Sequence, residues 1–289
     1  MSNANYVLAR SILTRQKEKH PLFQIDATLN PYFGCAYNCM YCPYVVRSKV
    51  SVKTNFLSFL KEKLAIEKKK LHLGIGTSCE PYCEEEKEFR LTRGTVETAV
   101  KSGMPVQIFT KSELALEDAG MFAEYSEKGL LAVTISLFTL DRKLAKYFEP
   151  GFPVPEDRIN LLKKLKKKGV FAGIALAPVM PYISDSKEQI EQIFQAVQKA
   201  GGDYILPVAL NITNEKIKQK MDEAFLKVFP GSRLGFQTIY GEKKLPDDVY
   251  SSWMDQYFRI LSGKYDIPAY LPVENVEPGL ISISREIPE

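Results

Sequence analysis

The sequence predicts an α/β protein built as a partial (β/α)6 TIM barrel, open on one side, with a C-terminal cap region. Apolar segments of strand length alternate with segments of helical periodicity, which is typical of a parallel sheet with helical crossovers. Right-handed crossovers repeated in one direction curve such a sheet toward a barrel, and six units leave the barrel incomplete. The 289 residues, 45% of them hydrophobic, are enough for one large core.

The elements follow one another in a regular order. The predicted strands lie near residues 25–30, 71–76, 105–110, 131–137, 170–177 and 203–209. The predicted helices lie near residues 55–69, 92–102, 113–128, 156–168 and 186–200. The last helix has the clearest pattern, because Ile190, Ile193 and Val197 recur at helical spacing. Two glycines then end it. Polar motifs follow the strand ends, where α/β barrels place their chemistry.

The chain divides by composition into three parts. We expect residues 1–24 to form an N-terminal extension, residues 25–215 the partial barrel and residues 216–289 a cap packed on the barrel. The last part carries many aromatic residues, including Trp253, but no cysteine. No apolar run approaches the roughly 20 residues that cross a bilayer, and the first twenty residues lack a secretion signal. We therefore expect a cytoplasmic protein without a membrane partner.

The charge of the chain permits an acidic partner without requiring one. The net charge is +4, and the pI near 8.6 is below the level that by itself indicates a nucleic-acid-binding domain. The densest basic run is "LLKKLKKKG", residues 161–169, in a helical pattern whose lysines lie largely opposite the apolar face. A solvated helix face and a phosphate-contacting patch both fit this pattern.

Three of the five cysteines, Cys35, Cys39 and Cys42, lie within eight residues of the segment "NPYFGCAYNCMYC". A structural zinc site needs four protein ligands, and the candidates for a fourth are His20, His72, Cys79 and Cys83. An electron-transfer protein would supply four thiolates to an iron–sulfur cluster. Three thiolates instead leave one iron of a cubane cluster open to a substrate or cofactor. The three alternatives are therefore a zinc-stabilised binding module, an electron carrier and an enzyme with an open iron.

The C-x3-C-x2-C spacing resembles the signature of the radical S-adenosylmethionine (SAM) superfamily. The opening "LNPYFGC" is similar to that of its spore photoproduct lyase-like branch. The segments "GTSCEPYCEEEKEFRLTRG", "FTKS", "TISLFT", "FEPGFPVPEDRI" and "LAPVMP" resemble this branch in the same order. The resemblance spans roughly residues 11 to 210. It implies a [4Fe-4S] cluster whose open iron chelates SAM, and this accounts for three cysteines rather than four.

The resemblance also implies roles for single residues. Cys35, Cys39 and Cys42 match the cluster ligands, and Tyr41 matches an aromatic residue that packs near the adenine of SAM. The remaining SAM contacts implied by the resemblance are Ser78 and Glu80 for the methionyl amino group, Lys111 for the carboxylate, Ser136 for the ribose and the backbone at Ala177 for the adenine. Each of these residues also has an ordinary structural explanation, such as a serine bonding the local backbone.

Two further pairs of residues are conspicuous. Glu149 lies in the "FEPG" turn and Arg158 begins a predicted helix, and the two form either a local ion pair or a support for cofactor or substrate. In the lyase, a cysteine at the end of the second strand returns a hydrogen atom to the product radical. The matching position here is Thr77, and Cys79 comes two residues later. Cys79 is therefore a candidate hydrogen donor, and Cys79 and Cys83 are alternatively an unreactive half-buried pair.

The activity implied by the resemblance is reductive cleavage of SAM to a 5′-deoxyadenosyl radical, which abstracts a hydrogen atom from a substrate. The electron would come from an external one-electron donor such as flavodoxin or ferredoxin. The substrate could be a nucleic acid, a peptide or a small molecule. Repair of a nucleic-acid base lesion, as in spore photoproduct lyase, is the specific alternative within this class.

Overall fold

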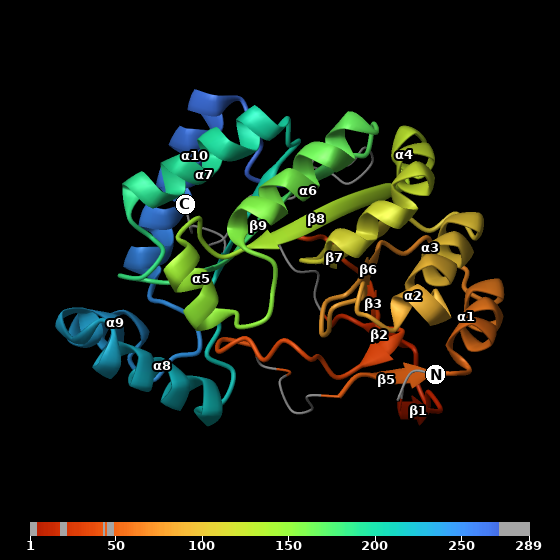
Figure 1. Cartoon of the computed structure of the whole chain (residues 1–289), viewed down its shortest axis with the longest axis horizontal. Coiled ribbons are helices and arrows are strands. Elements are labelled where there is room, and N and C mark those ends of the chain that lie inside the picture. Colours follow the sequence, from red (N-terminus) through yellow and green to blue (C-terminus); the bar gives the residue numbers. More distant parts are fainter. Residues whose placement is uncertain (1–4, 18–21, 43, 45–48, 272–289) are drawn as a thin grey trace.

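A seven-stranded sheet forms the centre of the molecule (Figure 1). The structure, a computed structural model, describes residues 5–17, 22–42, 44 and 49–271. The parallel strands are β3 (Ala27–Leu29), β6 (Leu73–Ile75), β7 (Val106–Thr110), β8 (Leu131–Leu137), β9 (Ala172–Val179) and β10 (Ile205–Ala209). They follow one another across the sheet in chain order, and β2 (Leu13–Arg15) pairs antiparallel with β3. The predicted α/β fold with six parallel strands is confirmed, and the described sheet is not closed.

The predicted helices connect these strands. They are α1 (Phe56–Ala65), α3 (Leu91–Lys101), α4 (Ala119–Glu127), α6 (Pro155–Lys167) and α7 (Lys187–Ala200). The expected single helix over 113–128 is instead the 3-10 helix η1 (Glu113–Asp118) followed by α4. Gly120, a residue of low helix propensity, lies near the junction.

The sequence patterns did not predict several short elements. They are β1 (Asn5–Val7), β4 (Tyr32–Phe33), β5 (Ser51–Lys53), α2 (Glu86–Phe89) and α5 (Arg142–Phe148). The first three form a separate sheet in the order β1-β5-β4. Strands of two or three residues are too short to show alternation. The signal for α5 was its N-cap, since the Asp141 carboxylate accepts hydrogen bonds from the backbone N–H groups of Lys143 and Leu144 at 2.7 and 3.1 Å.

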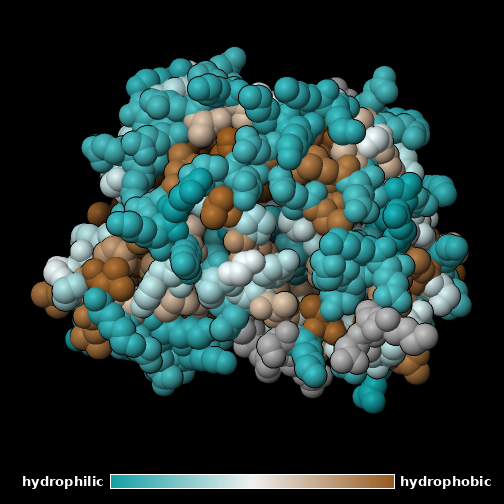
Figure 2. Space-filling model, in the orientation of Figure 1, coloured by the Kyte–Doolittle hydropathy of each residue, from teal (hydrophilic) through white to brown (hydrophobic). Residues whose placement is uncertain are grey.

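The C-terminal region is helical. It contains α8 (Glu215–Lys227), the 3-10 helix η2 (Pro230–Ser232), α9 (Arg233–Tyr240) and α10 (Asp248–Tyr265). α10 lies along α7, where the rings of Phe194 and Phe258 are 5.7 Å apart. α8 and α9 pack through Phe225 and Phe236, with ring centroids 4.3 Å apart. Figure 2 shows apolar surface over these two helices, where Leu234 is 77% exposed. The region thus packs on the barrel helices, and the boundaries at 25 and 215 remain predictions.

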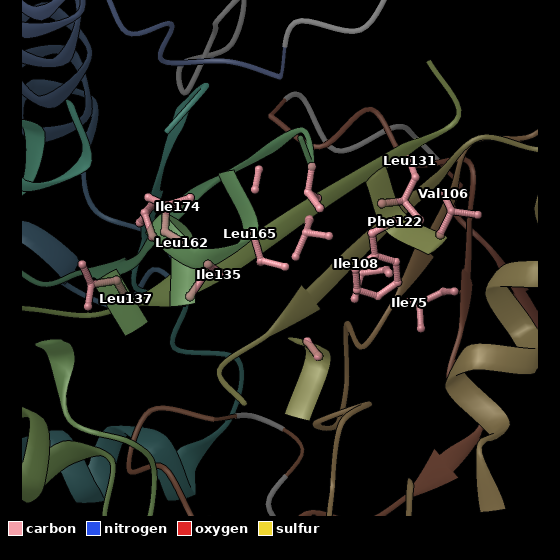
Figure 3. Packing of buried hydrophobic residues seen from close by; sticks show 14 of the residues in the cluster. Ile75, Val106, Ile108, Phe122, Leu131, Ile135, Leu137, Leu162, Leu165 and Ile174 are labelled. Carbon is pink, nitrogen blue, oxygen red and sulfur yellow. The ribbon is translucent and has the colours of Figure 1, made fainter. Parts of the chain in front are cut away.

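The main core lies between the sheet and its helices (Figure 3). Alternate residues of a strand point to opposite faces, and in β8 Leu131, Val133 and Ile135 face the helices. They pack there with side chains such as Leu165 of α6 and Phe122 of α4, both fully buried. Burial of each such side chain is worth about 1.5–3 kcal/mol. The intervening residues, including Ser136, face the opposite side of the sheet.

The end of the basic run lies away from the carboxyl ends of the strands, because α6 runs back toward the start of β9. Two of its lysines pair with carboxylates: Lys166 Nζ lies 2.6 Å from Asp203, and Lys164 Nζ lies 3.2 Å from Glu113. These pairs favour the solvated-face interpretation over a phosphate patch at the site. No helix within the described ranges has both the length and the apolar composition needed to span a membrane.

Candidate active site

The carboxyl ends of the parallel strands carry the polar residues singled out in the sequence. Ser136 is the one residue of β8 that is not buried, and Ala177 is the one such residue of β9. Lys111 directly follows the fully buried β7, and its side chain is 16% exposed. Because β7 and β8 pair Thr110 with Ile135, Lys111 and Ser136 come next at the same level of the sheet. These residues therefore lie along the carboxyl edge of the sheet, where each is partly exposed.

The cysteine loop follows β4 and docks against the end of α5. Gly34 turns the chain out of β4 with a φ of +87°, a conformation that glycine adopts readily. The Met40 N–H then donates to the Phe148 carbonyl at 2.9 Å, and the Cys42 N–H donates to the Cys39 carbonyl at 3.2 Å. Cys39 is buried, while Cys35 and Cys42 are half-buried. The first of these bonds attaches the loop to the end of α5, and the second closes a turn within the loop.

The thiols of this loop lie in a poorly solvated setting. Burial raises the pKa of Cys39 to about 12, and the nearby Lys111 ammonium opposes this rise. Burial also raises the pKa of Cys42. In the described part of the chain, no three His, Cys, Asp or Glu side chains converge on a point that would hold one metal ion. A cubane cluster does not require such convergence, because each thiolate binds a different iron.

Among the residues considered as a fourth zinc ligand, Cys79 and Cys83 lie beside the cysteine loop, because Cys35 packs against their cluster, whereas His72 lies away from it. His72 precedes β6 at the opposite end of the sheet, where its Nδ1 lies 3.1 Å from the Gln24 carbonyl. Cys79 and Cys83 belong to a buried cluster with Tyr32, Val50, Val52 and Leu91. His20 falls outside the described residues. A donor set of three soft thiolates in one loop fits an iron–sulfur cluster with one open iron better than a four-ligand zinc site.

The loop after β6 is tied to both neighbouring strands. Glu80 is 7% exposed and accepts hydrogen bonds from the backbone N–H groups of Lys111 at 2.9 Å and Tyr82 at 3.0 Å, and from the Thr110 hydroxyl. Burial raises the pKa of Glu80, and these hydrogen bonds oppose the rise. The Glu80 carboxylate therefore links the loop after β6 to the end of β7.

Asn30 and Lys53 contact the site, but the sequence reasoning gave them no role. The Asn30 side chain accepts a hydrogen bond from the Ser78 N–H at 3.2 Å, and the Cys79 thiol lies 3.4 Å from the Tyr32 carbonyl. Lys53 Nζ donates to the Asn30 carbonyl at 2.6 Å. The signal for Asn30 was its place in the "NPY" motif. Lys53 had no such signal, since it comes from the separate small sheet.

Lys111, Tyr41, Glu149 and Arg158 meet beside the cysteine loop. The Tyr41 hydroxyl donates to the Glu149 carboxylate, and Arg158 forms an ion pair with the same carboxylate at 2.7 Å. Lys111 Nζ lies 3.7 Å from Glu149. Burial lowers the pKa of Lys111, but Cys39 and Glu149 outweigh this effect and leave the pKa raised. Lys111 is therefore a cation at neutral pH.

Comparison with known proteins decides the family. The profile of the radical SAM superfamily matches residues 29–197, more than half of the chain. The chain belongs to the radical SAM superfamily. Radical SAM proteins use a [4Fe-4S] cluster and SAM as cofactors. This membership favours the open-iron alternative over the zinc-binding module and the electron carrier.

The curated relatives share moderate identity with this radical SAM chain. An uncharacterized protein of Mycobacterium tuberculosis is 28% identical over 199 residues, covering 64% of this chain and 58% of that protein. An uncharacterized protein of Methanocaldococcus jannaschii is 30% identical over 167 residues, covering 54% and 61%. A radical SAM Nα-GlyT isomerase of Pseudomonas phage M6 is 20% identical over 300 residues, covering 94% and 60%. The match spans less than two thirds of each of these relatives.

Solved radical SAM structures share the fold. A spore photoproduct lyase structure aligns with a TM-score of 0.68 at 13% identity, covering 92% of this chain and 81% of the lyase chain. SuiB of Streptococcus suis, solved with bound S-adenosylmethionine, aligns with a TM-score of 0.53 at 19% identity, covering 73% and 47%. At these identities the likeness concerns the fold alone.

Proposed function

We propose that this chain is a radical SAM enzyme whose cluster is bound by Cys35, Cys39 and Cys42. The main support is the row of partly exposed residues at the carboxyl edge of an otherwise buried sheet, next to a loop with three thiols. When bound, the reduced cluster and SAM would together supply a 5′-deoxyadenosyl radical that abstracts a hydrogen atom from the substrate.

The residues of the chain have distinct tasks in this proposal. The Lys111 ammonium pairs with the carboxylate of SAM, the Ser136 hydroxyl bonds the ribose, and the backbone at Ala177 contacts the adenine. Ser78 and Glu80 would receive the methionyl amino group of bound SAM, and the Tyr41 ring would pack near its adenine. The surrounding barrel and the C-terminal helices keep water from the reacting atoms.

The proposed enzyme has three candidate classes of substrate. A nucleic acid, a peptide and a small molecule each remain part of the proposal. A nucleic-acid base is the more specific candidate, because the fold of spore photoproduct lyase covers 92% of this chain and that lyase was solved with a dinucleoside spore photoproduct. An external donor such as flavodoxin or ferredoxin supplies the electron, and the enzyme works in the cytoplasm.

The test is anaerobic purification followed by metal and sulfide analysis. We expect about four irons and four sulfides per chain, with one iron not held by the protein. Addition of dithionite and SAM should then yield methionine and 5′-deoxyadenosine. Incubation with deuterated candidate substrates identifies the true one by deuterium in 5′-deoxyadenosine. Stoichiometric zinc without sulfide would contradict the proposal.

Cys79→Ala is expected to change the products rather than the cleavage of SAM. The Cys79 thiol is buried in the loop next to Ser78 and Glu80, and burial raises its pKa to about 12, which keeps it protonated. A thiol S–H bond is weaker than most C–H bonds, so a protonated thiol can return a hydrogen atom to a carbon radical. The variant should abstract hydrogen normally and give side products or adducts.

The measurement is the product profile of Cys79→Ala under turnover. Thr77→Ala is the matched control, since Thr77 occupies the lyase donor position but has no thiol. An unchanged profile in Cys79→Ala removes this residue from the mechanism and leaves it a packing role.

A further inference from the structure

Glu149 connects three parts of the candidate site that are far apart in the sequence. Its side chain is 1% exposed and lies in the turn after α5. It accepts the hydrogen bond of Tyr41, which belongs to the cysteine loop, and it pairs with Arg158 of α6 and Lys111 after β7. No other carboxylate among the described residues has ion pairs with two cations that are each less than one-fifth exposed.

Arg158 holds Glu149 in place. Its guanidinium donates to the Pro153 carbonyl and the Ser136 carbonyl, both at 3.1 Å, in addition to the ion pair with Glu149. A guanidinium with three partners in a buried setting is rigid. Glu149 is thereby fixed relative to the end of β8, where Ser136 lies.

Lys111 is held less tightly. Its distance of 3.7 Å from Glu149 is an ion-pair distance rather than a hydrogen-bond distance, so Glu149 attracts the ammonium without taking up its N–H donors. Its Nζ also lies 4.7 Å above the ring of Phe152, and this ring stacks at 3.8 Å on Tyr37 of the cysteine loop. Lys111 is therefore drawn to this position by Glu149 and Phe152 and keeps its N–H donors for an anion.

We propose that Glu149 is a positioning residue that fixes the cysteine loop, through Tyr41, and the Lys111 ammonium in one geometry relative to each other. This inference rests on the proposed function, in which the loop binds the cluster and Lys111 binds the SAM carboxylate. Without Glu149, the cysteine loop and the Lys111 ammonium would no longer be held relative to each other. Ordering them would then cost free energy when the cofactor binds.

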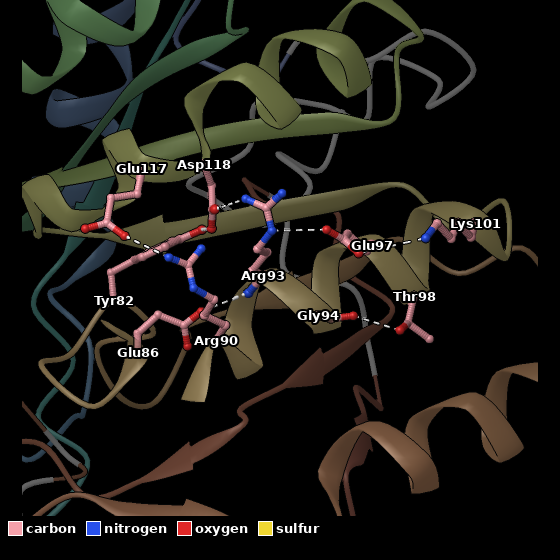
Figure 4. A network of polar contacts seen from close by, with 10 residues as sticks. All are labelled: Tyr82, Glu86, Arg90, Arg93, Gly94, Glu97, Thr98, Lys101, Glu117 and Asp118. Carbon is pink, nitrogen blue, oxygen red and sulfur yellow. Dashed lines mark hydrogen bonds and ion pairs between the residues drawn. The ribbon is translucent and has the colours of Figure 1, made fainter. Parts of the chain in front are cut away.

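The chain contains a matched control for this arrangement. Tyr82, Asp118 and Arg93 form a second tyrosine–carboxylate–arginine group, shown in Figure 4. The Tyr82 hydroxyl donates to Asp118 at 2.9 Å, Arg93 pairs with it at 2.5 Å, and the Asp118 side chain is 4% exposed. It involves neither the cysteine loop nor Lys111. Asp118→Asn therefore removes a comparable buried charge outside the cysteine loop.

The first test uses the iron-free chain. Alkylation by iodoacetamide is followed at each cysteine by mass spectrometry in the wild type, Glu149→Gln, Tyr41→Phe and Asp118→Asn. Loss of a hydrogen bond to a charged group should raise the open population of the loop, so that Cys39 is alkylated about tenfold faster in the first two variants. Asp118→Asn should leave the rate at Cys39 unchanged.

The second test uses the reconstituted protein, with the SAM dissociation constant and the change in the cluster EPR signal on addition of SAM as readouts. Glu149→Gln should raise the dissociation constant about 10-fold or more, by analogy with outer partners of metal ligands, and should diminish the EPR change. Tyr41→Phe keeps the charge on Glu149 and should raise the SAM dissociation constant less than Glu149→Gln does. Asp118→Asn should match the wild type in both readouts.

The outcomes separate the two proposals. A wild type that takes up no cluster or binds no SAM contradicts the proposed function itself. A wild type that binds both, with Glu149→Gln showing the same SAM affinity, EPR change and Cys39 alkylation, overturns the positioning role alone. If Glu149→Gln does not fold, the folded Tyr41→Phe variant tests the positioning role instead. Unchanged alkylation of Cys39 in Tyr41→Phe would also overturn the proposal.

Discussion

Cys39→Ala is expected to abolish reductive SAM cleavage. Cys39 is the one buried thiol of the cysteine loop, and its removal leaves two protein ligands for a cluster that already has one open iron. Loss of a direct ligand should cost more than the roughly 10–100-fold that loss of an outer partner costs. The measurement is 5′-deoxyadenosine formed per chain under anaerobic reduction, together with iron content. The same result is expected for Cys35→Ala and Cys42→Ala.

Cys83→Ala is the matched control for these variants. Cys83 is also buried, but it lies in the cluster around Tyr32, and burial is the main factor that raises its pKa. We expect this variant to keep its iron and to cleave SAM at nearly the wild-type rate. Cleavage retained in Cys39→Ala, or lost only in Cys83→Ala, would mean that the cluster ligands have been assigned wrongly.

Arg158→Met is expected to lower the free energy of unfolding of the iron-free protein by about 3–5 kcal/mol, because it leaves the buried Glu149 carboxylate without its closest cation. Both side chains of this pair are 1% exposed. Lys111, at 3.7 Å, compensates only in part. Urea unfolding followed by circular dichroism gives the free energy directly.

Arg142→Met is the control for this substitution. Arg142 pairs with Glu156, but the two side chains are 66% and 47% exposed, so the loss should be much smaller than that in Arg158→Met. The double variant Arg158→Met/Glu149→Gln should recover part of the stability, because no uncompensated charge then remains buried. Equal losses in Arg158→Met and Arg142→Met would show that the buried pair is worth no more than an exposed one.

The regular part of the fold was predictable because apolar segments alternate with periodic helices along the chain, although β3 and β6 have only three residues each. The six parallel strands and the helices between them carry enough apolar residues for their faces to be recognised from spacing alone. The short strands β1, β4 and β5 were not predictable, since their pairing depends on contacts across 20 to 50 residues of chain. The C-terminal helices were left unassigned, although Asp247 caps α10 by accepting from the Tyr250 N–H at 2.8 Å.

The candidate site was predictable as a set of residues but not as a network. Strand-end positions such as Lys111 and Ser136 could be placed on one edge of the sheet from topology. The meeting of Tyr41 with Glu149, 108 residues later, depends on how α5 ends against the cysteine loop. Sequence reasoning left Glu149 open between a local ion pair and a supporting role. Only the packing shows that it contacts both the loop and Lys111.

The two outermost parallel strands of the sheet, β3 and β10, are each paired on their outer side with a segment from an opposite end of the described chain. β2 pairs antiparallel with β3 at one edge, and at the other the Ile205 N–H of β10 donates to the Pro268 carbonyl beyond α10 at 2.9 Å. Exposed strand edges invite pairing with strands of other molecules, and covered edges prevent it. A fragment limited to residues 25–215 would lack both covers. We expect it to associate with itself by intermolecular strand pairing, which light scattering of the fragment against the full chain would detect.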